Sequence, residues 1–102
     1  MIAEKITVTT TPTTIHSLIC QARGEALGND NIKSVMFRTS GSAAVLMEEK
    51  NTNTAVTMLD PANDQPFIAY EDFNLTNIKL SVASATAEVE VIASQTGSIG
   101  IR

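Results

Sequence analysis

The sequence holds one histidine and one cysteine, His16 and Cys20, four residues apart. On a helix this spacing places both side chains on one face, where they could supply two ligands to a transition metal. Structural zinc usually takes four protein ligands and catalytic zinc three, and the chain has no second histidine or cysteine to complete either set. A nucleophile and base are also disfavoured, because side chains one helical turn apart seldom meet in near-attack geometry. We therefore expect a packed cysteine, a surface histidine and no bound metal.

Four acidic residues bracket one turn-rich stretch and could gather oxygen ligands for calcium: Asp60, Asp64, Glu71 and Asp72. Their spacing does not match an EF-hand, and the glycine and terminal glutamate of that loop are missing. The alternative is a solvated acidic turn, and this is the interpretation that we favour.

Paired carboxylates for glycoside hydrolysis must be held apart across a cleft. Glu88 and Glu90 stand two residues apart in an alternating stretch, which places both on one face of a strand instead. The single histidine limits any Ser-His-Asp arrangement, and no Gly-x-Ser-x-Gly elbow occurs. The hydroxyl residues around Gly41 lack the Gly-Lys-Ser/Thr of a phosphate loop. The sequence therefore predicts a non-enzymatic protein without a cofactor.

Composition narrows the range of partners. Eleven acidic residues against seven scattered basic ones give a net charge of −4, whereas nucleic-acid binding needs a concentrated basic face, so nucleic acid is not an expected partner. The lone cysteine excludes an internal disulfide and favours a reducing compartment at synthesis, with a disulfide-free secreted protein as the alternative. No run approaches the roughly 18 apolar residues that span a bilayer, so no membrane partner is expected. The first residues do not form a signal sequence, and we expect synthesis without one.

Side chains alternate between apolar and polar through residues 73–83 and again through residues 87–93, which is the period of a half-buried strand. We expect these two strands to form a hairpin joined by residues 84–86. Glu88 and Glu90 then face solvent. The inward positions are Ala87, Val89, Val91 and Ala93.

The rest of the sequence predicts the strands and the helix that would position a functional site. Strands are expected at residues 6–11, 32–38, 43–48, 54–59 and 67–70, and the apolar spacing of Ile15, Leu18, Ile19 and Ala22 predicts a short helix over residues 14–22. The three central strands read as a meander or part of a Greek key. Together they predict one all-β domain over residues 1–102, a β-sandwich of about seven short strands for which a jelly-roll is one arrangement. Residues 1–5 are expected to be a contact arm, and residues 95–102 either a second contact arm or a disordered tail.

Two stretches carry a resemblance to a known group of proteins. A Thr-rich strand runs into Thr-Thr-Ile-His-Ser-Leu-Ile (residues 13–19), and Asp-Phe-Asn-Leu-Thr-Asn-Ile-Lys-Leu (residues 72–80) leads into a closing Val-rich segment. This pattern resembles the small β-sandwich structural proteins of tailed-phage virions and extends over most of the chain. The resemblance implies a capsid decoration or cement protein, or a related head or fibre-base component, that is symmetric and often trimeric. It implies no catalytic residues.

That resemblance also implies the partners and the location. The partner would be the major capsid protein or another virion protein, and the protein would reside on the capsid surface after synthesis in the host cytoplasm. The expected contact residues are apolar side chains near the two ends, which a core of this size need not absorb: Met1, Ile2, Ile99 and Ile101.

A second hypothesis is a free-standing ligand-binding module that presents residues 60–64 and 28–31 to a glycan or a calcium-dependent ligand. Sugar platforms usually use exposed tryptophan or tyrosine. The chain has no tryptophan, and Tyr70 is its one tyrosine, which weighs against this alternative.

Overall fold

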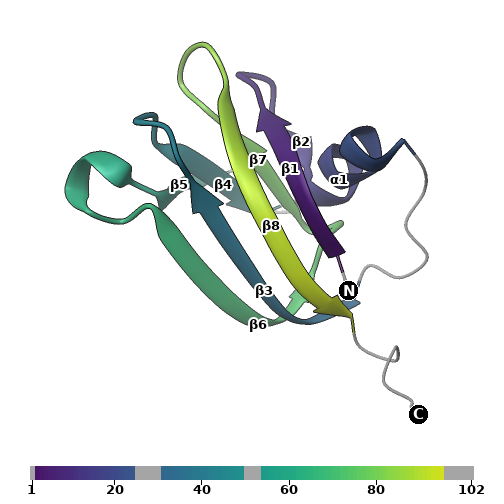
Figure 1. The fold of residues 1–102 in the computed structure, drawn as a ribbon. Helices are drawn as coiled ribbons and strands as arrows, with labels where there is room; N and C mark the ends of the chain where they lie inside the picture. Colours follow the sequence, from purple (N-terminus) through teal and green to yellow (C-terminus); the bar gives the residue numbers. More distant parts are fainter. Residues whose placement is uncertain (1, 25–30, 50–53, 96–102) are drawn as a thin grey trace.

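The computed structural model describes residues 2–24, 31–49 and 54–95. These residues form eight strands, one α-helix and one 3-10 turn (Figure 1). In chain order the elements are β1 (Ile2–Val8), β2 (Thr13–Thr14), α1 (Ile15–Arg23), β3 (Asn31–Thr39), β4 (Val45–Glu49), β5 (Ala55–Leu59), η1 (Pro61–Asn63), β6 (Phe67–Asn74), β7 (Ile78–Ser81) and β8 (Ala87–Gln95).

The strands form two four-stranded antiparallel sheets. The first sheet has the order β1-β8-β3-β6, and the second has the order β2-β7-β4-β5. Strand β1 pairs with β8, β2 with β7, β3 with β6 and β4 with β5, which is the pairing of one long hairpin wrapped into two layers. Two further pairings, β3 with β8 and β4 with β7, join the wrapped arms side by side. This is the jelly-roll order, so the structure confirms the predicted all-β sandwich in its jelly-roll form.

The core lies between the two sheets and is built from the inward-facing residues of alternating strands. Along β8 the four predicted inward residues are buried: Ala87, Val89, Val91 and Ala93. Most of the other core residues are aliphatic, as the composition requires, including Ile6 and Val8 on β1 and Leu59 on β5. Phe37 is the one fully buried aromatic residue among the described residues.

Helix α1 begins and ends where its sequence provides caps. The Thr14 hydroxyl accepts a hydrogen bond from the Ser17 amide at 3.2 Å, which satisfies one of the free donors of the first turn. At the other end Gly24 adopts φ 78°, a left-handed conformation that glycine reaches without a steric penalty, and its amide donates to the Cys20 carbonyl.

The apolar face of α1 packs against the end of the sandwich beside β1 (Figure 1). Ile15, Leu18 and Ile19 are buried there, as the spacing predicts. Ala22 was expected on the same face but is exposed, in the last turn before the C-cap at Gly24.

The expected C-terminal hairpin is wrong. Residues 73–83 do not form one strand, because β6 ends at Asn74 and the chain turns before β7 begins at Ile78. Strand β7 belongs to the second sheet and β8 to the first, so residues 82–86 connect the two layers instead of turning within one. The Val82 amide donates to the Thr9 carbonyl at 3.0 Å and holds this connection against the end of β1. Alternation gives the face of each residue but not the strand that pairs with it.

Of the two arrangements expected for the three central strands, the meander is wrong, whereas part of a Greek key agrees with the jelly-roll order. Strands β4 and β5 form a hairpin, but β3 lies in the first sheet and β4 in the second, so the Gly41 loop crosses between layers. Strand β6 continues through the predicted bend at residues 71–72, where Asp72 adopts φ 53° without ending the strand. Cross-strand bonds to β3 on both sides of Asp72 keep the chain extended.

The N-terminal contact arm is a core strand over most of its length. Ile2 is 1% exposed, and β1 pairs with β8 from this residue onward, so Ile2 is not a surface contact. The first strand thus begins four residues earlier than predicted, because the edge of β8 extends far enough to pair with it. Met1, Ile99 and Ile101 lie outside the described residues.

Candidate interaction surface

The outer face of the first sheet carries apolar residues in a line across all four strands. The register places Ala3 of β1 opposite Ile92 of β8, Ile92 opposite Met36 of β3, and Met36 opposite Ala69 of β6. We call these four residues the apolar row. Ile92 is 43% exposed, which is unusual for a large aliphatic side chain, and both alanines are exposed. Two open hollows adjoin the row, and Met36 and Ile92 line both of them.

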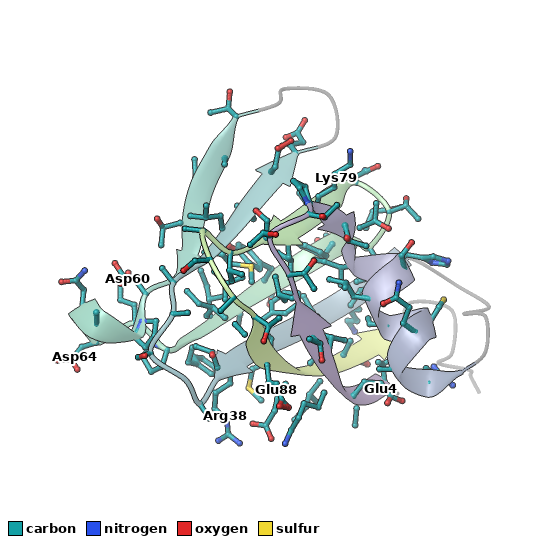
Figure 2. The ribbon with its side chains drawn as sticks, turned by 90° about the horizontal axis from the view of Figure 1, so that it is seen from above. Glu4, Arg38, Asp60, Asp64, Lys79 and Glu88 are labelled. Carbon is teal, nitrogen blue, oxygen red and sulfur yellow. The ribbon has the colours of Figure 1, made fainter. Side chains whose placement is uncertain are left out.

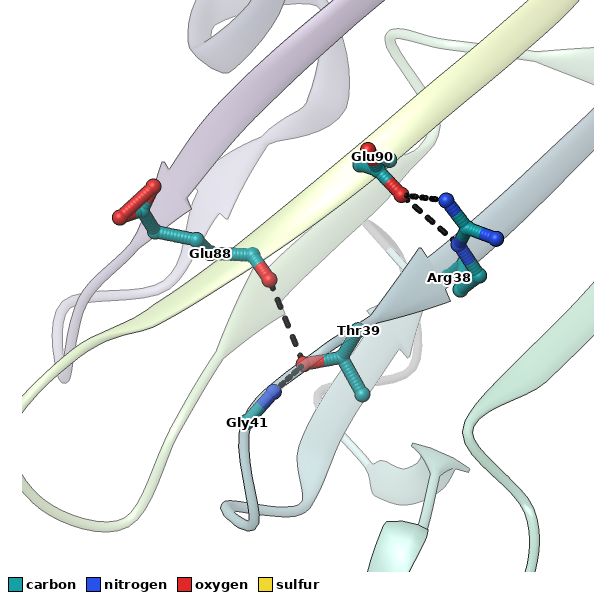
Figure 3. Close-up of polar contacts among 5 residues, drawn as sticks. All are labelled: Arg38, Thr39, Gly41, Glu88 and Glu90. Atoms are coloured by element: carbon teal, nitrogen blue, oxygen red, sulfur yellow. Dashed lines mark hydrogen bonds and ion pairs between the residues drawn. The ribbon is translucent and has the colours of Figure 1, made fainter.

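A charged row runs beside the apolar row. Lys5 lies opposite Glu90, Glu90 opposite Arg38, and Arg38 opposite Phe67. The Arg38 guanidinium donates to one Glu90 oxygen through Nε at 2.7 Å and through a terminal nitrogen as well (Figure 3). Because Glu90 stands between two cations, the row alternates in sign along the sheet.

On the other side of the apolar row the sheet is polar. Ser34 of β3 lies opposite Ser94 of β8 and Glu71 of β6. The face therefore has an apolar centre between a charged border and a polar border. Protein interfaces share this arrangement of an apolar core and a polar rim.

Thr39 fixes the end of β3 against β8 next to this face. Its side chain is buried, and its hydroxyl donates to the Glu88 carbonyl at 3.3 Å while accepting from the Gly41 amide at 3.3 Å (Figure 3). The bond to Gly41 also begins the connection that leaves the first sheet. Thr39 therefore holds the strands that carry Arg38 and Glu90 in register.

The structure brings His16 and Cys20 together more closely than the spacing suggests. Cys20 Sγ lies 3.5 Å from His16 Nε2, so the two side chains are in contact along α1. Within the described ranges no group of three or more histidine, cysteine, aspartate or glutamate side chains could hold a metal ion.

The acidic residues around the 3-10 turn do not form a common site. Figure 2 shows Asp60 and Asp64 on a loop at the far end of the molecule from Glu4. Asp60 Oδ2 accepts from the Asn63 side chain at 2.7 Å, and a bridge between Asp60 and Gln65 closes the loop. Glu71 and Asp72 lie on β6 and do not join them around one point. Residues 28–30 of the other proposed ligand loop lie outside the described residues.

Tyr70 faces the core instead of presenting a ring to solvent. It stacks on Phe73 with ring centroids 5.4 Å apart and meets Phe37 edge-on, and its hydroxyl contacts Met47 Sδ of the second sheet at 3.6 Å. Burial raises the pKa of the Tyr70 phenol above its usual value.

Sequence reasoning did not find the apolar row, although one signal was present. Val91, Ile92 and Ala93 form an apolar run that interrupts the alternation of β8. Since Val91 and Ala93 face inward, Ile92 must face outward, and an outward isoleucine marks an exposed apolar site.

Among the residues that the structure describes, no helix is long and apolar enough to cross a membrane. Searches of protein-family models, curated proteins and solved structures find no match to this chain.

Proposed function

We propose that this protein is a non-enzymatic structural protein that binds a neighbouring protein through the outer face of its first sheet. The observation that carries the proposal is the apolar row, in which Ile92 and Met36 stand exposed or half-buried between polar borders. A large exposed aliphatic residue at the centre of a regular sheet face gains free energy when a partner covers it.

We propose further that the partner is the major capsid protein or another virion protein, and that the chain acts as a capsid decoration or cement protein of a tailed phage. The support is the resemblance of residues 13–19 and 72–80 to that group. Jelly-rolls are frequent among viral capsid domains and also among lectins, so the fold agrees with the proposal without assigning a function.

The size of the face favours binding by several copies at once. Four strands about 4.8 Å apart, with seven to nine residues each at about 3.3 Å, give roughly 500 Å² per partner. That is about two thirds of the roughly 800 Å² per partner in a standard stable interface. A single copy would therefore bind weakly, and a homo-oligomer on a repeating lattice would gain avidity. The resemblance favours three copies.

The glycan-binding alternative has less support. Its one candidate stacking residue, Tyr70, packs against Phe73 and Phe37 on the inner face of the first sheet. An added sugar would have to displace that contact.

The test is cosedimentation of the purified protein with capsids from the source phage that were assembled without this chain. We expect saturable binding with a fixed number of copies per capsid. Ile92→Lys should weaken binding at least tenfold, because it places a charge in the apolar row. Thr7→Lys is the matched control. It adds the same charge to the outer face of the first sheet, on β1 and outside the apolar row. Absence of the chain from intact virions, or equal binding by both variants, would contradict the proposal.

A further inference from the structure

The jelly-roll leaves two strands at the edges of each sheet. They are β1 and β6 in the first sheet and β2 and β5 in the second. An edge strand presents unpaired backbone donors and acceptors to one side, and a second chain can pair with them unless charge, proline, irregularity or a covering element prevents it.

Three of the four edges carry such protection. Helix α1 lies beside β1 (Figure 1). Arg23 Nε on the helix is 3.7 Å from Glu4 Oε2 on the strand. Strand β2 has two residues and follows Pro12. Strand β6 follows Pro66, and at Asp72 its φ of 53° interrupts the regular edge.

Strand β5 has none of these protections along its outer half. Its sequence, Ala-Val-Thr-Met-Leu, contains no charged residue and no proline. Ala55, Val56 and Thr57 are exposed, and Val56 is 47% exposed although it lies opposite Met47 on the core-facing side. The register shift in the β4–β5 hairpin lies at its base, next to Val45, and leaves these three residues regularly paired.

We propose that β5 pairs antiparallel with β5 of a second copy of this chain, so that the two second sheets join into one eight-stranded sheet. The contact is isologous, because each strand presents the same edge to the other. A two-fold axis perpendicular to the sheet keeps each residue on its own face, so one residue must lie opposite its own copy. When Val56 lies opposite Val56 of the second copy, Ala55 of each copy lies opposite Thr57 of the other. This register therefore pairs all three exposed residues.

Charge favours a second copy at this edge over the other edges. No charged side chain of β5 meets its counterpart in the pair. Of the acidic residues near β5, Glu48 and Glu49 lie on β4 behind it, and Asp60 follows Leu59 beyond the three exposed residues. Across the pair the two copies of β4 are three strand spacings apart, about 14 Å, which exceeds the screening length of about 8 Å at physiological salt. Pairing through β6 would instead bring together two copies of Glu71 and Asp72.

The pair also covers apolar surface that the monomer leaves in water. Val56 of each copy would pack against the other, and cross-strand pairs of branched residues stabilise antiparallel sheets. The inference goes beyond the proposed function, since it needs no capsid. It predicts a dimer in place of the trimer that the resemblance favours.

Disulfide trapping tests the register. Opposed Cα atoms in an antiparallel pair are about 4.5 to 5.5 Å apart, within the range that a disulfide spans. In a Cys20→Ser background we would compare Ala55→Cys, Val56→Cys and Thr57→Cys under mild oxidation, with Thr7→Cys on β1 as the control. Val56→Cys should give the highest yield of covalent dimer. No dimer at Val56, or equal yields at all four positions, would overturn the proposal.

Light scattering provides the second measurement. The wild-type protein should have the mass of a dimer at concentrations where Val56→Lys is a monomer that keeps the circular dichroism spectrum of the folded chain, while Thr7→Lys remains dimeric. A wild-type monomer or trimer that binds capsids would overturn the β5 pairing and leave the proposed function standing. A wild-type dimer that dissociates in Val56→Lys but never binds capsids would support the β5 pairing and overturn the proposed function.

Discussion

The two sheets share one core, but they leave different parts of themselves uncovered. The outer face of the first sheet carries an apolar row, and both of its edges are protected. The outer face of the second sheet is mostly polar, since Glu48 lies opposite Lys79 and Lys79 opposite Thr14, and its Leu46 is half-buried. Its edge at β5 is open. The first sheet therefore exposes apolar side chains on its outer face. The second sheet instead exposes the backbone groups along its β5 edge.

The largest effect is expected in the core that lies between the two sheets. Phe37 is fully buried, and its ring meets Tyr70 at 6.3 Å and Phe73 at 5.8 Å between centroids. Phe37→Ala should lower the free energy of unfolding by about 3 to 5 kcal/mol, since it removes core area and leaves a cavity. Urea unfolding followed by circular dichroism measures this loss.

Phe67→Ala is the matched control for that substitution. Phe67 lies on the outer face of β6 and is 49% exposed, so its removal should cost less than about 1 kcal/mol. Similar losses for the two variants would show that the core is not shared in the way the structure indicates.

The next prediction concerns a bond inside the first sheet. Thr39→Val keeps the shape of the side chain but removes the hydroxyl that bonds Glu88 and Gly41. It should cost about 1 to 2 kcal/mol, because two backbone groups near a buried position lose their partner. Thr57→Val, on the exposed part of β5, should change stability by less than about 0.5 kcal/mol. Equal changes in urea unfolding would argue against a structural role for the Thr39 hydroxyl.

The sequence predicts the layers of this molecule better than their connections. Alternation identifies the inward residues of β8, and the apolar spacing of α1 places that helix within one residue. The same alternation cannot say that β7 and β8 lie in different sheets, because a strand keeps its inward side whichever neighbour it has. Long-range pairing decides that point.

The apolar row and the β5 edge were not predicted from the sequence, for two different reasons. Ile92 carries a local signal, since it interrupts an alternating stretch, and could have been identified from the sequence. Val56 carries none, because being at an edge is a property of the whole topology and not of residues 54–59. Ile2 shows the opposite error, since an apolar residue near the end of the chain is part of the core.

A smaller effect is expected from Tyr70, which joins the sheets through the contact of its hydroxyl with Met47. Burial raises the pKa of the phenol, so the folded state favours the neutral form. Its contribution to stability is therefore complete below the unfolded value of about 10 and declines as the pH rises through the folded pKa.

The phenolate absorbance measures this directly, because Tyr70 is the one tyrosine and the chain has no tryptophan. The titration midpoint of Tyr70 should be higher in the folded protein than in urea. Tyr70→Phe should remove the part of the alkaline loss of stability that is caused by ionisation of this phenol. An identical midpoint in both states would show that the ring is solvated.

The smallest effect belongs to the pair on the outer face of the first sheet. Arg38 and Glu90 are bonded but have side chains 60% and 42% exposed, so solvent screens them. A double-mutant cycle with Arg38→Gln and Glu90→Gln should give a coupling of about 0.2 to 1 kcal/mol at low salt and less at high salt. Glu48 and Lys79, opposite each other on the second sheet, provide the matching cycle. If the Arg38–Glu90 pair serves as a border of the apolar row, breaking the pair should weaken capsid binding more than it lowers the free energy of unfolding. The substitutions at Glu48 and Lys79 should leave capsid binding unchanged.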